Sequence, residues 1–253
     1  MSIDWQTTRA AIWRRHRQAL RAVHEIDRVR LSDLLEIDRQ KAAIVTNTEH
    51  FLKGEPANNT LLWGSRGTGK SSLIKALLNE YADRGLRVIE VDREDLLFLP
   101  EIVDEIRALP YRFIIFSDDL SFGHDDASYK ALKSVMEGSI ESPPENVRVY
   151  ATSNRRHLMP EYMKDNQAAQ MVDGELHLGE AIEEQISLSD RFGLWLSFYP
   201  FDQKEYLHLV DALFPNVEDR ESLHLAAIRF ATAKGGRSGR AARHFYNTYY
   251  DQF

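Results

Sequence analysis

The stretch that decides the fold of this chain is Thr60-Leu61-Leu62-Trp63-Gly64-Ser65-Arg66-Gly67-Thr68-Gly69-Lys70-Ser71-Ser72-Leu73. An apolar run leads into Gly64, four residues follow, and then comes Gly69-Lys70-Ser71, which is the spacing of a P-loop. Glycines let the backbone turn sharply, so that successive N–H groups point into one concavity that fits a phosphate. The pattern predicts a strand, a phosphate-binding loop and a helix, and hence the binding of a nucleoside triphosphate.

Each part of this loop has an expected task. Lys70 supplies a mobile positive charge to the β- and γ-phosphates, and the hydroxyl of Ser71 is a candidate ligand for Mg²⁺. The helix that begins near Lys70 adds free N–H groups and the positive end of its dipole. The residues expected to contact the nucleotide are Gly64, Ser65, Arg66, Gly67, Thr68, Gly69, Lys70, Ser71 and Ser72.

The composition is that of a water-soluble globular protein. Of the 253 residues, 43% are apolar and 28% are charged, enough for one substantial core and a smaller appendage. The absence of cysteine excludes disulfides, thiolate catalysis and cysteine-bound metals. No apolar run is long enough to span a bilayer, and the first residues lack the pattern of a signal peptide, so we expect a cytoplasmic protein without a membrane partner.

Residues 4–30 are expected to form one helix, because Trp5, Ile12, Ala19, Val23 and Ile26 recur at helical spacing. The remaining faces are crowded by Arg9, Arg14, Arg15, Arg17, Arg21, Arg28 and Arg30. A solvated helix packed by its apolar stripe is the favoured interpretation. The alternative is a docking arm for an acidic partner or nucleic acid. The net charge of −7 argues against broad nucleic-acid binding, although a local basic patch is compatible with it.

Strands and helices alternate through the middle of the chain, and helices alone follow. Expected strands are 60–64, 86–91, 112–117, 147–152 and 194–199, and expected helices are 39–52, 70–81, 101–109, 128–140 and 180–189. Residues 165–179 are expected to be a polar surface excursion, and residues 202–214, 218–233 and 238 onward to be helical. The pattern predicts an α/β fold with a parallel core over residues 31–199 and a small all-α lid over residues 200–253.

Two adjacent acids follow the strand 112–117, at the edge where ligands of open parallel sheets gather. Asp118 is placed to hold Mg²⁺, and Asp119 to orient and polarise an attacking water. Asn154 follows the next strand, where a neutral amide would bind the γ-phosphate or that water without adding charge. A helix cap, a solvated turn or a local backbone contact would also explain these residues.

Two arginines later in the chain are further candidates. Arg191, in the turn Asp190-Arg191-Phe192-Gly193, is placed to reach a phosphate across a subunit boundary. Arg240 would sit in the first turn of the last helix, where a cation is unfavourable unless it faces an anionic partner. An ion pair with Asp190 and an ordinary basic surface segment are the respective alternatives.

In this order, the P-loop, the acidic pair, the asparagine, the Arg-Phe-Gly turn and the late Gly-Arg helix resemble the AAA+ ATPases. Within that superfamily the sequence looks most similar to a bacterial family of predicted AAA+ ATPases of unknown function. The matching stretches are 58–64, 116–122, 152–157 and 188–195.

This resemblance implies a P-loop NTPase αβα sandwich with a five-stranded parallel sheet of order 5-1-4-3-2 and a ring-like homo-oligomer, usually a hexamer. It implies that ATP binds between core and lid, with Lys70 and Ser71 as Walker A and Asp118 and Asp119 as Walker B. It further implies that Asn154 is sensor 1, Arg191 the finger acting in trans and Arg240 sensor 2. By the same resemblance, Ile37 would line the adenine pocket.

One departure affects the expected activity. Most AAA+ ATPases carry Asp-Glu where this chain has Asp118-Asp119, and aspartate is one methylene shorter. Bacterial replication initiators are similar in using Asp-Asp, so slow hydrolysis is expected. The sequence thus favours an ATPase that remodels or switches an unidentified protein partner. An ATP-gated scaffold that scarcely hydrolyses ATP and a P-loop phosphotransferase remain as alternatives.

Overall fold

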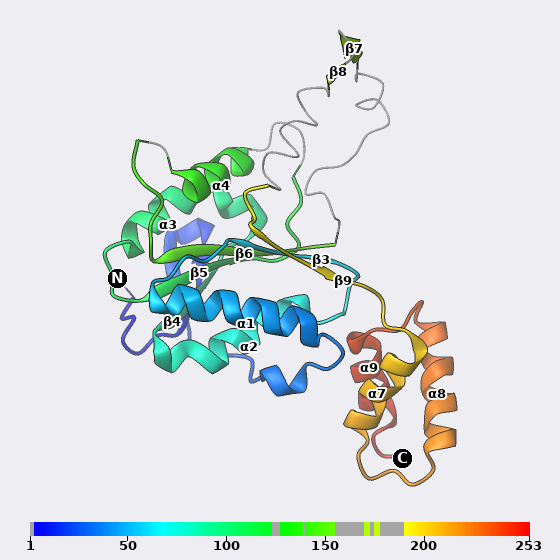
Figure 1. Cartoon of the computed structure of the whole chain (residues 1–253). Helices are drawn as coiled ribbons and strands as arrows, with labels where there is room; N and C mark the ends of the chain where they lie inside the picture. The colour runs from blue at the N-terminus through cyan, green and yellow to red at the C-terminus, as the bar shows by residue number, and fades with distance from the viewer. Residues whose placement is uncertain (1–2, 123–126, 139, 155–169, 173–174, 178–189) are drawn as a thin grey trace.

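The computed structural model describes residues 3–122, 127–138, 140–154, 170–172, 175–177 and 190–253. A seven-stranded sheet lies at its centre, with strand order β2-β1-β4-β5-β6-β3-β9 (Figure 1). Its strands are β1 (Ala10–Arg14), β2 (Ala19–Val23), β3 (Thr60–Gly64), β4 (Leu86–Glu90), β5 (Arg112–Ser117), β6 (Val147–Ser153) and β9 (Leu194–Phe198). Every neighbouring pair is parallel except β1 and β2, so the sheet is mostly parallel, as the alternation of strands and helices predicts.

The five expected strands occur in the expected order. Read from one edge, the sheet runs β9, β3, β6, β5 and β4, which is the order 5-1-4-3-2. The predicted number of strands is wrong, however, because β1 pairs with the outer side of β4 and β2 pairs with β1. The residues before the core therefore extend the same sheet.

The prediction of one helix over residues 4–30 is wrong for the same reason. Residues 10–23 form an antiparallel hairpin, in which a short 3-10 turn (Arg15–Arg17) and Gln18 in the left-handed region reverse the chain. Arginine and alanine favour helices locally, but the free edge of β4 offers a ladder of backbone hydrogen bonds that a helix cannot fill. In this hairpin Ala11 and Trp13 alternate with Ile12, and both are buried.

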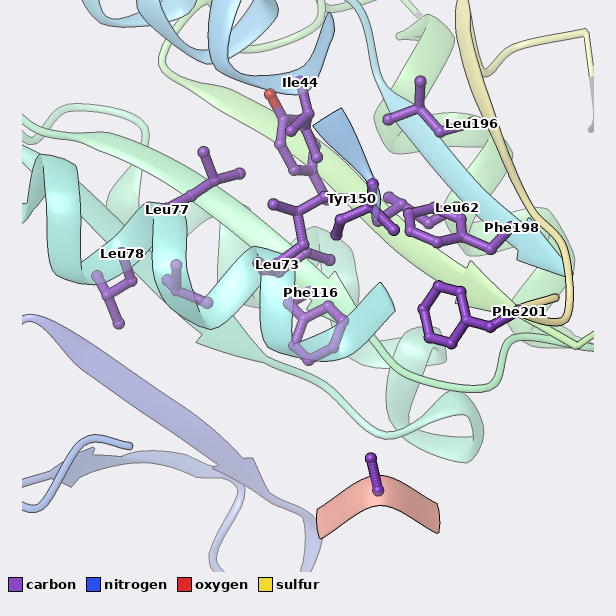
Figure 2. Close-up of a cluster of buried hydrophobic side chains, with 14 of the residues drawn as sticks. Ile44, Leu62, Leu73, Leu77, Leu78, Phe116, Tyr150, Leu196, Phe198 and Phe201 are labelled. Atoms are coloured by element: carbon purple, nitrogen blue, oxygen red, sulfur yellow. The ribbon is translucent and has the colours of Figure 1, made fainter. Parts of the chain in front are cut away.

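Helices cover both faces of the sheet (Figure 1). One face carries α1 (Asp38–Lys53) and α2 (Lys70–Tyr81), and the other carries α3 (Leu99–Ile106) and α4 (Ala127–Glu137). Successive strand residues enter opposite cores: Leu61 belongs to the cluster that includes α3, and Leu62 to the cluster that includes α1 and α2. In Figure 2, Leu73 of α2 and Ile44 of α1 lie close to Leu62 and Tyr150 of the sheet. This packing fixes α2, and therefore the loop that precedes it.

Three helices follow the last strand and form a bundle beside the end of the sheet (Figure 1). They are α7 (Gln203–Leu213), α8 (Arg220–Ala233) and α9 (Gly239–Tyr249). Asp202, Asp219 and Ser238 cap their N-termini by accepting hydrogen bonds from backbone N–H groups of the first turn. The fully buried rings of Tyr206 and Phe245 belong to the same apolar cluster as α1 and α2. The apolar core of the bundle is therefore continuous with the core between the sheet and the helices α1 and α2.

Some expectations fall outside the residues that the structure describes. Of the segment after Asn154, only β7 (Gln170–Val172) and β8 (Glu175–His177) are described, and they pair antiparallel. The expected helix 180–189 and the matched residues 155–157 lie outside the description. Among the described residues, no helix is both long enough and apolar enough to cross a membrane.

Candidate functional site

The loop after β3 has the geometry that its glycines predict. Gly64 has a φ of 123°, and a Cβ at this position would lie 2.0 Å from the carbonyl oxygen of Phe198. The backbone N–H of Ser65 donates to the same oxygen at 2.8 Å. Only glycine fits so close to a neighbouring backbone, so β9 fixes the point at which the chain leaves β3. Gly69, with φ 100°, ends the loop directly before α2.

Lys70 is held at the centre of this loop and is only 7% exposed. Its Nζ donates to the carbonyl oxygens of Gly64 at 2.8 Å and Ser65 at 2.7 Å, and to Oδ1 of Asn154 at 3.4 Å. Burial lowers the pKa of the Lys70 ammonium below its ordinary value, while the nearby Asp118 carboxylate opposes this shift. A buried cation beside a row of backbone N–H groups is suited to binding an anion.

Asp118 lies opposite the first turn of α2. Its Oδ1 accepts a hydrogen bond from Oγ of Ser71 at 2.7 Å and one from Oγ1 of Thr152 at 2.5 Å. The three oxygens thus meet between β5, β6 and α2. Together, Ser71 and Asp118 present the hydroxyl and carboxylate oxygens that Mg²⁺ prefers.

Thr152 is a site residue that the sequence analysis missed. Its hydroxyl donates to Asp118 and accepts from the backbone N–H of Asp119 at 2.9 Å, so one side chain positions both acids. Its position in the sequence could have indicated this role. Thr152 lies at the end of the strand next to β5, and the carboxyl ends of parallel strands meet at one edge of the sheet. Threonine is common in strands because it is β-branched, so its presence there did not by itself indicate a role in the site.

Asp119 and Asn154 form the second pair of the site. Asp119 has a φ of 51°, a left-handed conformation that is uncommon for residues other than glycine. Nδ2 of Asn154 donates to Oδ1 of Asp119 at 2.5 Å, and a guanidinium nitrogen of Arg66 lies 3.9 Å from Oδ2. Since Oδ1 of Asn154 also accepts from Lys70, the amide connects the buried cation to the second acid.

These residues line one cleft with a volume of about 1000 Å³, which we call the P-loop cleft. The predicted site residues in its wall are Ile37, Arg66, Gly67, Thr68, Gly69, Lys70, Ser71, Ser72, Asp118, Asp119, Asn154 and Arg240. Gly64 and Ser65 stand behind the wall and hold Lys70 through their carbonyls. Leu34, Ile37 and Phe201 give the cleft an apolar side, which suits an aromatic base.

The helical bundle closes one side of the cleft. The backbone N–H of Arg240 lies 3.4 Å from the carbonyl oxygen of Gly67, and a Cβ on Gly67 would lie 3.0 Å from Oγ of Ser238. The start of α9 is therefore packed directly on the phosphate loop. The side chain of Arg240 is exposed and lines the cleft, so its position in the first turn of α9 places a cation beside the loop.

Arg191 is the predicted site residue that the structure does not bring to this cleft. It lies in the turn before β9, and its side chain is 14% exposed. A guanidinium nitrogen lies 2.5 Å from Oε1 of Glu137, at the end of α4. The sequence analysis considered a pair with Asp190, whereas the carboxylate found beside Arg191 comes from a distant helix.

A P-loop that opens a helix, an acidic pair at the end of β5 and a helical bundle over the loop define the class of this fold. The fold is that of the AAA+ ATPases. It is similar to the RuvB Holliday junction branch migration motor of Thermotoga maritima, with a TM-score of 0.50 and 12% identity over 87% of this chain and 72% of that one. A point mutant of that motor gives a TM-score of 0.52 at the same identity and coverage. At such identity the likeness concerns the fold alone.

Within this class, the chain belongs to the family described as "Protein of unknown function (DUF815)", whose model matches residues 6–253. A shorter stretch of 67 residues is 36% identical to the replication factor C large subunit of Staphylothermus marinus. That match covers 26% of this chain and 15% of the relative, so it spans only a small part of the relative's length.

Proposed function

We propose that this chain is an ATPase that binds ATP with Mg²⁺ in the P-loop cleft and hydrolyses it at the interfaces of a homo-oligomeric ring. The cycle would remodel or switch a macromolecular partner. The observation that carries the proposal is the connected set Lys70, Asn154, Asp119, Asp118 and Ser71 in the wall of one cleft. A nucleotide-binding core over residues 31–199 and a lid over residues 200–253 are part of the same proposal.

Binding would exchange contacts that the free protein already makes. The ammonium of Lys70 would turn from the carbonyls of Gly64 and Ser65 toward the β- and γ-phosphates, for which its charge is better suited. Ser71 and Asp118 would hold Mg²⁺, which would neutralise charge on the phosphate oxygens. Mg²⁺ is usually held by one or two protein ligands, with phosphate oxygens and water completing its coordination.

Hydrolysis would depend on the pair Asp119 and Asn154. The amide of Asn154 holds the Asp119 carboxylate at 2.5 Å, and that carboxylate would orient the attacking water and polarise it. Phosphoryl transfer requires mainly positioning and charge stabilisation, which such a prearranged pair supplies. Because aspartate is a methylene shorter than glutamate, the water must approach closer, and we expect slow turnover.

Completion of the site would require a second subunit. Arg191 lies outside the P-loop cleft of its own chain, and Glu137 holds its guanidinium. In a ring, Arg191 would exchange this carboxylate for the γ-phosphate bound by the neighbouring copy, and Arg240 would act within its own subunit. A side chain that must give up an ion pair first is suited to switching turnover on only after assembly.

A nucleotide-gated switch with very slow hydrolysis is the second candidate. It is favoured by the short carboxylate of Asp119 and by the pairing of Arg191 with Glu137. In this case bound ATP would hold the bundle against the P-loop through Arg240, and a partner would read that state. The two candidates share the cleft and differ in turnover.

The test is ATP turnover per subunit over a wide range of protein concentration with Mg²⁺, together with sedimentation with and without nucleotide. We expect specific activity to rise as oligomers appear. The substitution Arg191→Ala should preserve ATP binding and reduce turnover by about 10³-fold, the usual weight of such a finger. Arg229→Ala, which removes an exposed arginine of α8, is the matched control. Unchanged turnover in Arg191→Ala would reject the role in trans, and tight binding with no turnover at any concentration would support the switch.

A further inference from the structure

A second cavity, of about 890 Å³, opens at the tip of the β1–β2 hairpin. It shares no lining residue with the P-loop cleft. We call it the arginine pocket, and its lining residues are Trp13, Arg14, Arg15, His16, Arg17, Arg21, Asp92, Arg93, Glu94 and Asp95. Five arginines against three carboxylates make it positive, although the whole chain carries a formal charge of −7.

The acids of the pocket are engaged by only two of the arginines. Arg15 lies 4.0 Å from Glu94 and 3.9 Å from the buried Asp95, and Arg93 lies 3.9 Å from Glu94. Arg93 also donates to the carbonyl oxygen of Ser121 at 2.9 Å. These contacts fix the loop after β4 against the hairpin turn, so the pocket has a defined wall.

The other three arginines form no ion pair with any residue that the structure describes. Arg14, Arg17 and Arg21 are all exposed. The hairpin register pairs Ile12 with Arg21 and Arg14 with Ala19. Arg14 and Arg21 are therefore diagonal neighbours on one face, roughly 7–8 Å apart at the backbone, where like charges repel. An anion bound between them would remove this repulsion.

We propose that the arginine pocket binds the phosphate groups of a nucleic-acid strand, independently of the nucleotide in the P-loop cleft. The lining contains five arginines and no lysine. The planar guanidinium group of arginine presents a fork of donors that matches a phosphate better than the ammonium of lysine does. Several guanidinium groups placed side by side along a hairpin match a ligand in which charge repeats at regular intervals. A single phosphate would fill only a small part of the volume.

The lining also indicates what part of the strand is contacted. Trp13, its large aromatic residue, is only 3% exposed, so its ring is not available for a base to stack on. Phosphate contacts position a strand without reading its sequence. Binding is therefore independent of base sequence and falls steeply with salt.

The test is binding of a short labelled single-stranded oligothymidylate by fluorescence anisotropy, with ADP and Mg²⁺ at saturation so that the P-loop cleft is filled. The double variant Arg14→Gln, Arg17→Gln should bind about tenfold or more weakly. Its salt dependence should be less steep by about 1.4 in log–log slope, since each phosphate contact on a single strand contributes about 0.7. The double variant Arg39→Gln, Arg229→Gln removes the same charge from two other exposed sites and should bind like the wild type.

Folding is checked by thermal unfolding and by ADP affinity, which neither double variant should change. The single variant Arg17→Gln should also weaken oligothymidylate binding. Arg17 lies in the exposed turn, so its substitution has the least effect on packing. Equal weakening by the two double variants would overturn the proposal, because it would assign binding to general charge. Binding of an oligoglutamate or of tripolyphosphate in place of the oligothymidylate would overturn the assignment to a nucleic-acid strand.

Discussion

The P-loop cleft and the arginine pocket are both positive, but they are built in opposite ways. The cleft uses one buried lysine whose every donor has a partner set by the backbone or by Asn154. The pocket uses five arginines around an open cavity, three of them exposed and without an ion pair in the described residues. A buried, prearranged charge recognises one ligand group strongly, whereas many exposed charges each contribute little and are screened by salt.

The largest effect is expected from removing the single charge of the cleft. Lys70→Ala leaves the phosphates without their central cation, and the loss of a buried charge partner costs about 2–5 kcal/mol, or on the order of 10²-fold or more in affinity. Titration of ADP with Mg²⁺ by calorimetry measures it. The matched control is Lys53→Ala, which removes an exposed lysine at the end of α1 that lines neither the P-loop cleft nor the arginine pocket. Equal losses of ADP affinity in the two variants would mean that the cleft, like the pocket, binds through general charge and not through one buried lysine.

A second, smaller effect concerns the backbone that holds the cleft in shape. Gly64→Ala places a methyl group 2.0 Å from the carbonyl of Phe198 and forces a positive φ on alanine, so we expect a loss of about 3 kcal/mol in unfolding free energy. Gly85→Ala is the control, since Gly85 has a similar φ of 93° but nothing within 4 Å of the added carbon. Denaturant unfolding compares the two. A loss no greater at Gly64 than at Gly85 would mean that the contact with β9 does not constrain the loop.

The same contrast explains how much of the molecule could be predicted. The P-loop was predictable because its glycines, Lys70 and Ser71 act within one short segment, and their spacing alone defines the geometry. The hairpin was not, because it is stabilised by pairing with β4, far away in the sequence, while its arginines favour a helix locally. A pattern over a few residues contains no information about the distant edge of β4.

Within the site, the residues that could be predicted are again those whose position follows from the local sequence. Asp118, Asp119 and Asn154 follow apolar strands directly, so their meeting at one edge could be anticipated. The double hydrogen bond of Thr152 and the pairing of Arg191 with Glu137 depend on which elements become neighbours in space. The pairing of Arg191 leaves no local pattern in the chain, and Thr152 leaves only its place at the end of a strand.

The smallest effect separates the two sites by their response to pH. Burial lowers the pKa of Lys70 in the free protein, and bound phosphates favour its charged form, so the pKa rises on binding. ADP binding must then take up protons at alkaline pH, and the affinity should fall a few-fold as the pH rises through the lowered pKa of the free ammonium. Arginine, unlike lysine, is not deprotonated in proteins, so the oligothymidylate affinity of a site built on arginine should stay constant over this range. Calorimetry of ADP binding in two buffers of different ionisation enthalpy measures the proton uptake directly.

In Lys70→Arg, which cannot lose its charge, the uptake should vanish even if affinity is lower. Proton uptake that persists in this variant would assign it to another group, and a fall in oligothymidylate affinity over the same range would show that the pocket does not act through its arginines alone.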